Sequence, residues 1–150
     1  MSEVQQYVIF SINEQTYGIE ILKIKEVVSY RKITPLPNMR GFIKGIINLR
    51  GVVLPVFDLR EKFNLPETTY THFHTIIVME ISGRVIGVIV DEITDVVEIL
   101  PEEIQATSNL PPGMKTEYMK GIGKKEDKLV VLLDIDRLLS PEELEILDAA

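Results

Sequence analysis

Short apolar runs separated by glycines and polar turns dominate the pattern of the chain. Residues 7–12 form a β-branched and aromatic run that is typical of a strand and ends at the polar turn 13–15. Three further pairs of runs are joined by residues that favour tight turns, so each pair predicts a hairpin. These pairs are residues 74–81 with 84–90, 45–50 with 52–57, and 120–125 with 129–133. The pattern therefore predicts a mainly β fold.

The strands of one predicted hairpin do not alternate between apolar and polar residues. Residues 76–79 and 85–90 are apolar on both faces apart from Gly87. Such runs indicate strands that are covered on both sides, as between packed sheets or barrels.

Helices are few and short in this pattern. Ser140, Pro141 and Glu143 form a capping box with proline at the first helical position, which predicts a C-terminal helix. Residues 58–63 and 134–139 indicate single helical turns after strands. Residues 19–28 fit either a helix or a strand, and we interpret them as a helical turn followed by a strand.

The chain also resembles itself at two offsets, 69 and 76, with the glycines and Asp58/Asp134 aligned. A proline-rich linker at residues 101–114 accounts for the change of offset. The matched segments are residues 17–28 with 86–97, 42–46 with 118–122, and 56–59 with 132–135. This repeat predicts two similar β subdomains, roughly residues 12–70 and 71–140, completed by the chain ends. Each would close about five strands into a small barrel, with a binding groove between the two.

Composition narrows the classes of protein. The 150 residues include no cysteine, which excludes a disulfide scaffold and a thiolate site and suits a reducing compartment. The net charge of −7 disfavours nucleic acid as a partner. The longest stretch without a charged residue has 12 residues, fewer than the roughly 20 that a membrane span needs. The N-terminus lacks the pattern of a signal peptide, so we expect a cytoplasmic protein.

The sequence carries no recognisable catalytic motif, which favours a binding module over an enzyme. His72 and His74 share one face of a strand, but a third metal ligand is not evident beside them. Residues 121–125 lack the spacing of a phosphate loop, and no serine sits in a nucleophile elbow. We therefore expect no catalytic residue, no metal and no cofactor.

At Arg50 the two repeats differ in charge, which makes this residue a candidate for function. It lies at the tip of a predicted hairpin, and the repeat aligns it with Glu126. One interpretation is a solvated turn residue. The other is a planar donor at the edge of a groove, paired with a carboxylate of this chain or of a partner, with Glu26 as one candidate.

The segment FIKGIINLRGVVLPVFDLR, residues 42–60, resembles the signature of the CheW family of chemotaxis coupling proteins. Residues 17–18, 21–26, 87–91 and 116–118 and the pair at 134–135 continue the likeness, which spans nearly the whole chain. The resemblance implies two five-stranded SH3-like barrels and a non-catalytic adaptor. Such an adaptor links the cytoplasmic tips of transmembrane chemoreceptors to the regulatory domain of the histidine kinase CheA, and reaches the membrane only through receptor arrays.

By motif position, the resemblance also implies which residues face the partners. The receptor-binding set is Ile24, Glu26, Gly45, Arg50, Gly87 and Val96. The two glycines also fit close strand packing within a barrel, and both interpretations stay open. The kinase-facing set is Ile33, Leu36 and Met39, in a loop braced by prolines, although these residues could instead cover the core of the first barrel.

Two other classes of protein fit parts of the pattern. Length and strand content suit a single ligand-binding barrel of lipocalin type, which the repeat argues against. An RNA-binding barrel is disfavoured by the acidic charge and the absence of tryptophan.

Overall fold

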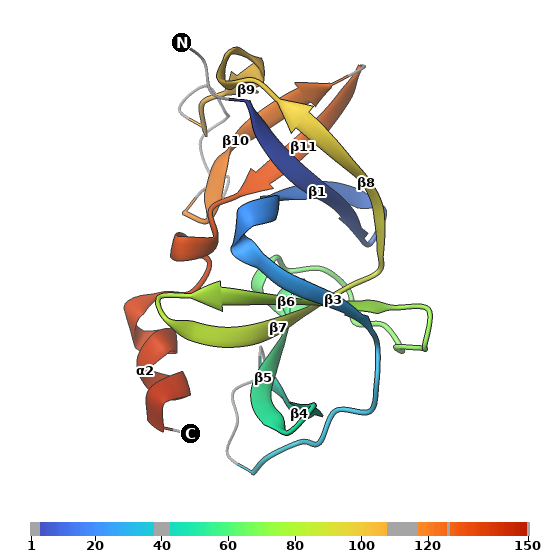
Figure 1. Cartoon of the computed structure of the whole chain (residues 1–150), viewed down its shortest axis with the longest axis vertical. Helices are drawn as coiled ribbons and strands as arrows, with labels where there is room; N and C mark the ends of the chain where they lie inside the picture. The colour runs from blue at the N-terminus through green and yellow to red at the C-terminus, as the bar shows by residue number, and fades with distance from the viewer. Residues whose placement is uncertain (1–3, 38–42, 108–116, 126, 150) are drawn as a thin grey trace. The chain divides into compact units, whose positions relative to one another are not determined.

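The fold of the chain is mainly β (Figure 1). The computed structural model describes residues 4–37, 43–107, 117–125 and 127–149. The strands are β1 Gln5–Ile12, β2 Gln15–Glu20, β3 Ile24–Ser29, β4 Ile43–Leu49, β5 Val52–Asp58, β6 Thr75–Ile81, β7 Arg84–Val90, β8 Glu92–Ile99, β9 Ile104–Gln105, β10 Met119–Lys125 and β11 Lys128–Leu133. The helical elements are η1 Ile21–Lys23, α1 Leu59–Lys62, η2 Pro101–Glu103, η4 Ile135–Arg137 and α2 Pro141–Ala149.

The predicted hairpins and helical turns are confirmed. Ser82 and Gly83 join β6 to β7 with φ angles of 49° and 82°, the left-handed pair that matches the twist of two-residue hairpins. The capping box of α2 forms as expected, because Ser140 N donates to Glu143 Oε1 at 2.8 Å and Glu143 N donates to Ser140 Oγ at 3.1 Å.

The strands divide between two sheets, with the orders β8-β1-β2-β11-β10-β9 and β3-β6-β7-β5-β4. The segment after β3 returns to pair Thr34 with Ile46 of β4, and β9, which follows β8, pairs with β10. Each sheet is thereby bounded at both edges by one continuous stretch of chain, the arrangement of a small closed barrel. The expectation of two small barrels is confirmed, and the single barrel of lipocalin type is wrong.

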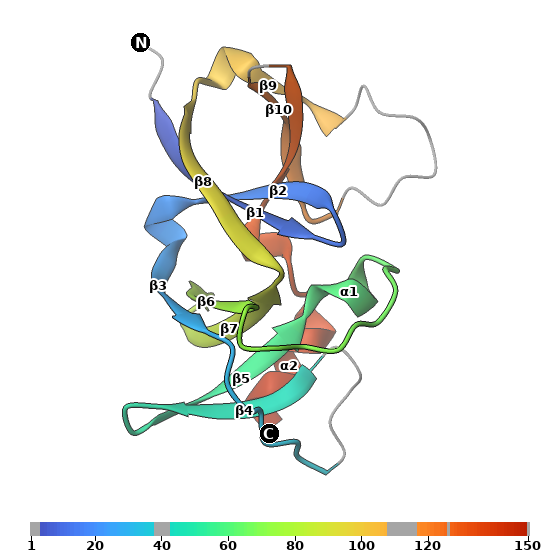
Figure 2. The ribbon, with the colours of Figure 1, turned by 90° about the vertical axis from the view of Figure 1, so that its right-hand side faces the viewer.

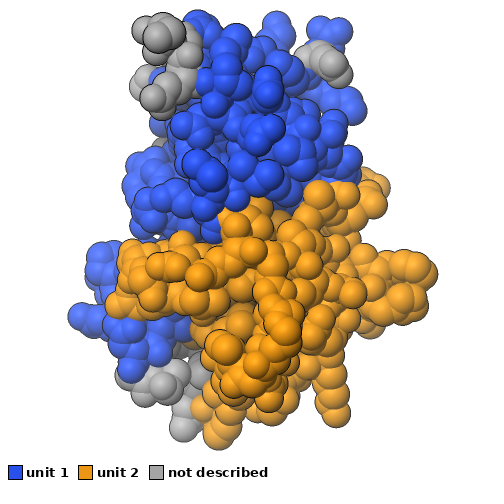
Figure 3. All heavy atoms as spheres, viewed as in Figure 1, with its two compact units in different colours: residues 1–10, 16–23, 94–150 blue, residues 11–15, 24–93 orange. Residues whose placement is uncertain are grey.

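The chain forms two compact units that do not follow the halves of the repeat. Unit 1 comprises Met1–Phe10, Thr16–Lys23 and Thr94–Ala150, and unit 2 comprises Ser11–Gln15 and Ile24–Ile93 (Figure 3). The division therefore differs from the predicted segments 12–70 and 71–140. The physical reason is strand exchange: β6 and β7 pair with strands of the first repeat, and β1 and β2 pair with strands of the second.

The two repeats nevertheless have equivalent strand registers. Gly18 of β2 lies opposite Leu132 of β11, and Gly87 of β7 lies opposite Val56 of β5, both in parallel pairings. The offsets of 69 and 76 map one pair onto the other. Matching bulges occur in β4 before Gly45 and in β10 before Gly121.

Each unit has its own apolar core. In unit 1 the central cluster combines residues of β1, β8 and β11, namely Tyr7, Ile9, Ile99, Val130 and Leu132. In unit 2 it combines residues of β4 to β7, namely Ile47, Leu49, Leu54, Val56, Ile76, Val78 and Ile89. The apolar runs are buried throughout residues 76–79 and 86–90, whereas Val85, the first residue of the predicted run 85–90, is half-buried. Within the described residues, no helix is long and apolar enough to cross a membrane.

Candidate functional site

Five of the six predicted receptor-binding residues lie in unit 2. Ile24 and Glu26 belong to β3, Gly45 to β4 and Gly87 to β7, while Arg50 is in the turn between β4 and β5. The sixth, Val96, lies on β8 in unit 1 and is 49% exposed.

Arg50 and Glu26 form an ion pair in which Arg50 Nη2 donates to Glu26 Oε2. This pair joins β3, at one edge of the five-stranded sheet, to the turn that leads out of β4, at the other edge. The Arg50 side chain is 69% exposed and that of Glu26 is 33% exposed, so the guanidinium keeps donors that face solvent. The carboxylate that the sequence offered as a partner for Arg50 is the one that it contacts.

A cavity of about 310 Å³ lies beside this ion pair. Its base is apolar, formed by Leu54 and Val78, each 2% exposed, and by the half-buried Val85. Its rim is charged and consists of Lys25, Glu26 and Arg50. Val52 of β5, which is 57% exposed, also lines this cavity. An apolar base within a charged rim is the composition of a protein-binding surface.

The two glycines of the predicted set have reasons internal to the fold. A Cβ at Gly45 would lie 2.2 Å from the backbone oxygen of Thr34, and the φ angle of Gly45 is +149°. A Cβ at Gly87 would lie 2.9 Å from Ile76 Cγ2 and 3.3 Å from Leu54 Cδ1. Close packing inside unit 2 therefore accounts for both glycines without a partner.

The predicted kinase-facing residues separate. Ile33 is half-buried and packs against the core of unit 2, whereas Leu36 is half-buried beside two exposed prolines. Met39 lies outside the described residues.

Unit 2 contains a buried charged cluster that the sequence pattern does not predict. Arg60 is 6% exposed and donates two hydrogen bonds to Asp91, at 2.8 and 3.0 Å. Asp91 also accepts from Asn13 N at 2.8 Å and lies 3.5 Å from His74 Nε2. Asp58, which is 5% exposed, caps α1 by accepting from Arg60 N at 2.8 Å, and it accepts from Tyr70 Oη. The signal that could have found this cluster is the DLR motif, whose aspartate and arginine both belong to it.

The pKa values of the two carboxylates in this cluster are shifted in opposite directions. Burial raises the pKa of Asp58 and outweighs the Arg60 N–H and the nearby positive charges. Burial also acts to raise the pKa of Asp91, but the hydrogen bonds from Arg60 and Asn13 and the charge of Arg60 outweigh it, so the pKa lies below its usual value. The cluster fastens α1 and the segment before β6 to the end of β7.

His74, one of the two histidines considered as metal ligands, belongs to this cluster through its contact with Asp91. Among the residues that the structure describes, no group of three or more His, Cys, Asp or Glu side chains could hold a metal ion.

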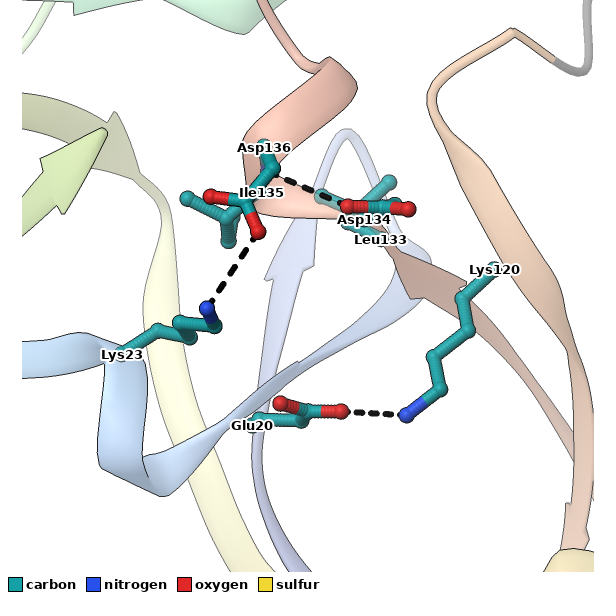
Figure 4. A pocket seen from close by; sticks show the side chains of 7 residues that line it. All are labelled: Glu20, Lys23, Lys120, Leu133, Asp134, Ile135 and Asp136. Carbon is teal, nitrogen blue, oxygen red and sulfur yellow. Dashed lines mark hydrogen bonds and ion pairs between the residues drawn. The ribbon is translucent and has the colours of Figure 1, made fainter. Parts of the chain in front are cut away.

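A second cavity, of about 230 Å³, lies in unit 1 between η1 and η4 (Figure 4). Lys23 Nζ lies 3.3 Å from Asp136 Oδ2 on one side, and Lys120 pairs with Glu20 on the other. Lys120 also donates to Tyr7 Oη at 2.8 Å. Burial would lower the pKa of Lys120, but the hydrogen bonds to Glu20 and Tyr7 outweigh it and raise that pKa. The charges lining this cavity are thus matched within the protein itself.

The comparisons with known proteins agree on one family. The family model of the CheW-like domain matches residues 6–143. The Chemotaxis protein CheW of Klebsiella aerogenes is 38% identical over 144 residues, covering 96% of this chain and 87% of that protein. The Chemotaxis protein CheW of Bacillus subtilis is 33% identical over 141 residues, covering 92% and 88%. Among solved structures, the scaffolding protein TtCheW of Thermoanaerobacter tengcongensis matches with a TM-score of 0.81 and 34% identity, covering 92% of this chain and 89% of that one.

Proposed function

The chain belongs to the CheW-like domain family, and we propose that it is a non-catalytic chemotaxis adaptor that couples transmembrane chemoreceptors to the histidine kinase CheA. It acts in the cytoplasm and reaches the membrane only through receptor arrays. The names of its relatives, which are chemotaxis and scaffolding proteins, support the general role. The specific partners are those that the resemblance of residues 42–60 implies, and we propose that the surfaces described above bind them.

The observation that carries this proposal is the Glu26–Arg50 pair at the rim of the apolar cavity in unit 2. A helical receptor tip can place apolar side chains over Leu54 and Val78 while its polar groups meet the charged rim. Ile24 and Val96 extend the proposed receptor-binding set, and Gly45 and Gly87 act in it by keeping the strands close. Ile33, Leu36 and Met39 form the proposed kinase-facing set.

The mechanism that follows is scaffolding. The protein holds a receptor tip and the regulatory domain of the kinase in a fixed relation, so that a change in the receptor can favour one state of the kinase over the other. The chain contributes binding free energy and geometry, and the kinase performs the chemistry.

Co-sedimentation tests this function directly. Membranes that carry the receptor's cytoplasmic region are mixed with kinase, with and without this chain, and the pellet is analysed for all three. We expect the kinase to sediment in larger amount when the chain is present, and the chain to sediment with receptor alone. A kinase that sediments equally with and without the chain would contradict the coupling role.

A further inference from the structure

Each half of the chain supplies a hairpin to the middle of the other half's sheet. The β6-β7 hairpin lies between β3 and β5 of the first half, and the β1-β2 hairpin lies between β8 and β11 of the second half. Figure 2 shows the strands of the two sheets in a second view. Neither sheet is built from the described strands of one half alone.

The two halves are matched where these hairpins are inserted. Gly87 of the second half leaves room for Leu54 and Val56 of the first, within 3.5 Å of a Cβ at its position. Gly18 of the first half leaves room for Leu132 and Val130 of the second, within 3.2 Å. The core of unit 2 combines four buried residues of β4 and β5 with three of β6 and β7. Removing either hairpin would therefore expose apolar surface on the strands of the half into whose sheet it is inserted.

The covalent link between the halves is a surface segment. It runs from Asn64, after the C-cap of α1, to His74, before β6, and residues 66–69 within it are all exposed. Its far end is held by Tyr30 N, which donates to His74 O at 2.9 Å. The strand pairings therefore depend on the side chains and backbones of the two halves and not on the peptide bonds between residues 66 and 69.

We propose that residues 1–66 and 67–150 are complementary halves that bind each other in trans, and that the partner for each half is the other half of a second copy of this chain. In the exchanged dimer, the first half of each copy pairs with the second half of the other. Every strand keeps its neighbours, and only the exposed segment at residues 66–69 has to change its path. Protein concentration then sets the share of dimer. Such a dimer carries each unit twice and is bivalent for any partner of a unit.

Two full-length variants test the exchange. Gly18→Val places a branched side chain against Leu132 and destabilises the sheet of unit 1. Gly87→Val places one against Ile76 and Leu54 and destabilises the sheet of unit 2. In each variant alone, one of the two units is destabilised. After exchange between the two variants, one pair of halves contains both substitutions and the other pair contains neither.

We expect the two variants, unfolded and refolded together, to give a dimer with a cooperative thermal transition that coincides with the wild-type transition. Refolded separately, neither variant should show it. The matched control mixes Gly18→Val with a chain carrying both substitutions, where no exchange yields an unsubstituted pair and no recovery is expected. A mixture of the two single variants that behaves as the sum of its parts would overturn the proposal.

A cut chain provides a second measurement that does not depend on either glycine. A protease site replaces residues 67–69, and the folded chain is cleaved there. The two pieces should co-elute, separate in denaturant, and recover the wild-type transition when mixed after removal of denaturant. Pieces that refold singly, or that fail to reassociate on mixing, would also overturn the proposal.

Discussion

Arg50 of the β4–β5 turn donates a hydrogen bond to Glu26 of β3, and this ion pair connects the two edges of the five-stranded sheet of unit 2. The pair is solvent-accessible, so its contribution to folding is small, about 0–1 kcal/mol. Arg50 is also one of the few residues other than glycine with a left-handed backbone, at φ +52°. Gly51 follows at φ +88°, so Arg50 and Gly51 form the same left-handed hairpin pair as Ser82 and Gly83, and the tight turn accounts for this backbone.

Arg50→Ala should separate recognition from folding. We expect the melting temperature to change little and binding to a receptor-tip fragment to weaken by about 2 kcal/mol, roughly 30-fold, as for an interface hot spot. Calorimetric titration and thermal melts measure the two effects. Lys128→Ala, at an exposed lysine of unit 1, is the control and should keep full affinity. Intact receptor binding together with marked unfolding would assign Arg50 to structure.

Gly45→Ala should destabilise the protein more than Gly51→Ala. A Cβ at Gly45 meets the Thr34 backbone oxygen at 2.2 Å, whereas a Cβ at Gly51 meets nothing within 4 Å, although both residues have positive φ. We expect a loss of about 2–3 kcal/mol in the free energy of unfolding at Gly45, from clash and strain together. At Gly51 the left-handed backbone alone costs about 1 kcal/mol. Urea denaturation of both variants tests the order, and equal losses would contradict the close approach.

Asp91→Asn should reduce the loss of unfolding free energy that the protein undergoes as the pH falls. Because the pKa of Asp91 is lowered in the folded protein, its carboxylate stabilises the fold above the unfolded pKa of about 4, and this stabilisation is lost as the pH falls through the folded pKa. The asparagine variant lacks it throughout. Urea midpoints between pH 7 and pH 2 should therefore converge toward those of the wild type in acid. Parallel curves would show that the Arg60–Asp91 pair is not linked to folding.

Asp58→Asn should have the opposite effect on the same curve. Burial raises the pKa of Asp58, so its ionisation disfavours the fold, and this penalty disappears as the pH falls through the raised pKa. In acid the wild type is therefore stabilised by protonation of Asp58, and the variant is not. The variant should therefore lose stability more steeply than the wild type as the pH falls, and a shallower acid limb would refute the assignment.

Leu36→Ala and Ile33→Ala should divide kinase binding from core packing. Ile33 packs on the core of unit 2, so its truncation should lower the free energy of unfolding by about 1–2 kcal/mol. Leu36 is the better candidate for direct contact, and its truncation should weaken binding to the kinase regulatory domain with little change in stability. Normal binding by Leu36→Ala, measured by titration, would remove it from the proposed kinase-facing set.

Local sequence patterns specify the strands and helices of this fold better than they specify which strands pair. Turn residues such as Ser82 and Gly83 encode hairpins locally, and the capping box at Ser140 encodes the start of α2. The pairing of Gly87 with Val56 is not encoded locally, because the repeat makes Leu132 an equally suitable neighbour by pattern. Which of two similar strands is adopted depends on linker lengths and long-range packing.

The candidate site was predictable to a similar extent. The hairpin tip singled out Arg50, and Glu26 was named as a possible partner. The cavity beside them could not be predicted, because Leu54, Val78 and Val85 come from three strands that only the folded sheet brings together. The DLR motif marks two residues of the Asp58–Arg60–Asp91 cluster, but only the fold shows that Asp58 and Arg60 are buried and that Asp91 lies beside Arg60.

The interleaving of strands also sets an order for synthesis on the ribosome. All strands of the sheet in unit 2 have been translated once Val90 has been added, whereas the sheet of unit 1 waits for Leu133. The β1-β2 hairpin is made first but must remain without its neighbours β8 and β11 until more than half of the chain has followed. Because contacts so distant in sequence form slowly, we expect unit 2 to fold co-translationally and unit 1 to close only near the end of translation.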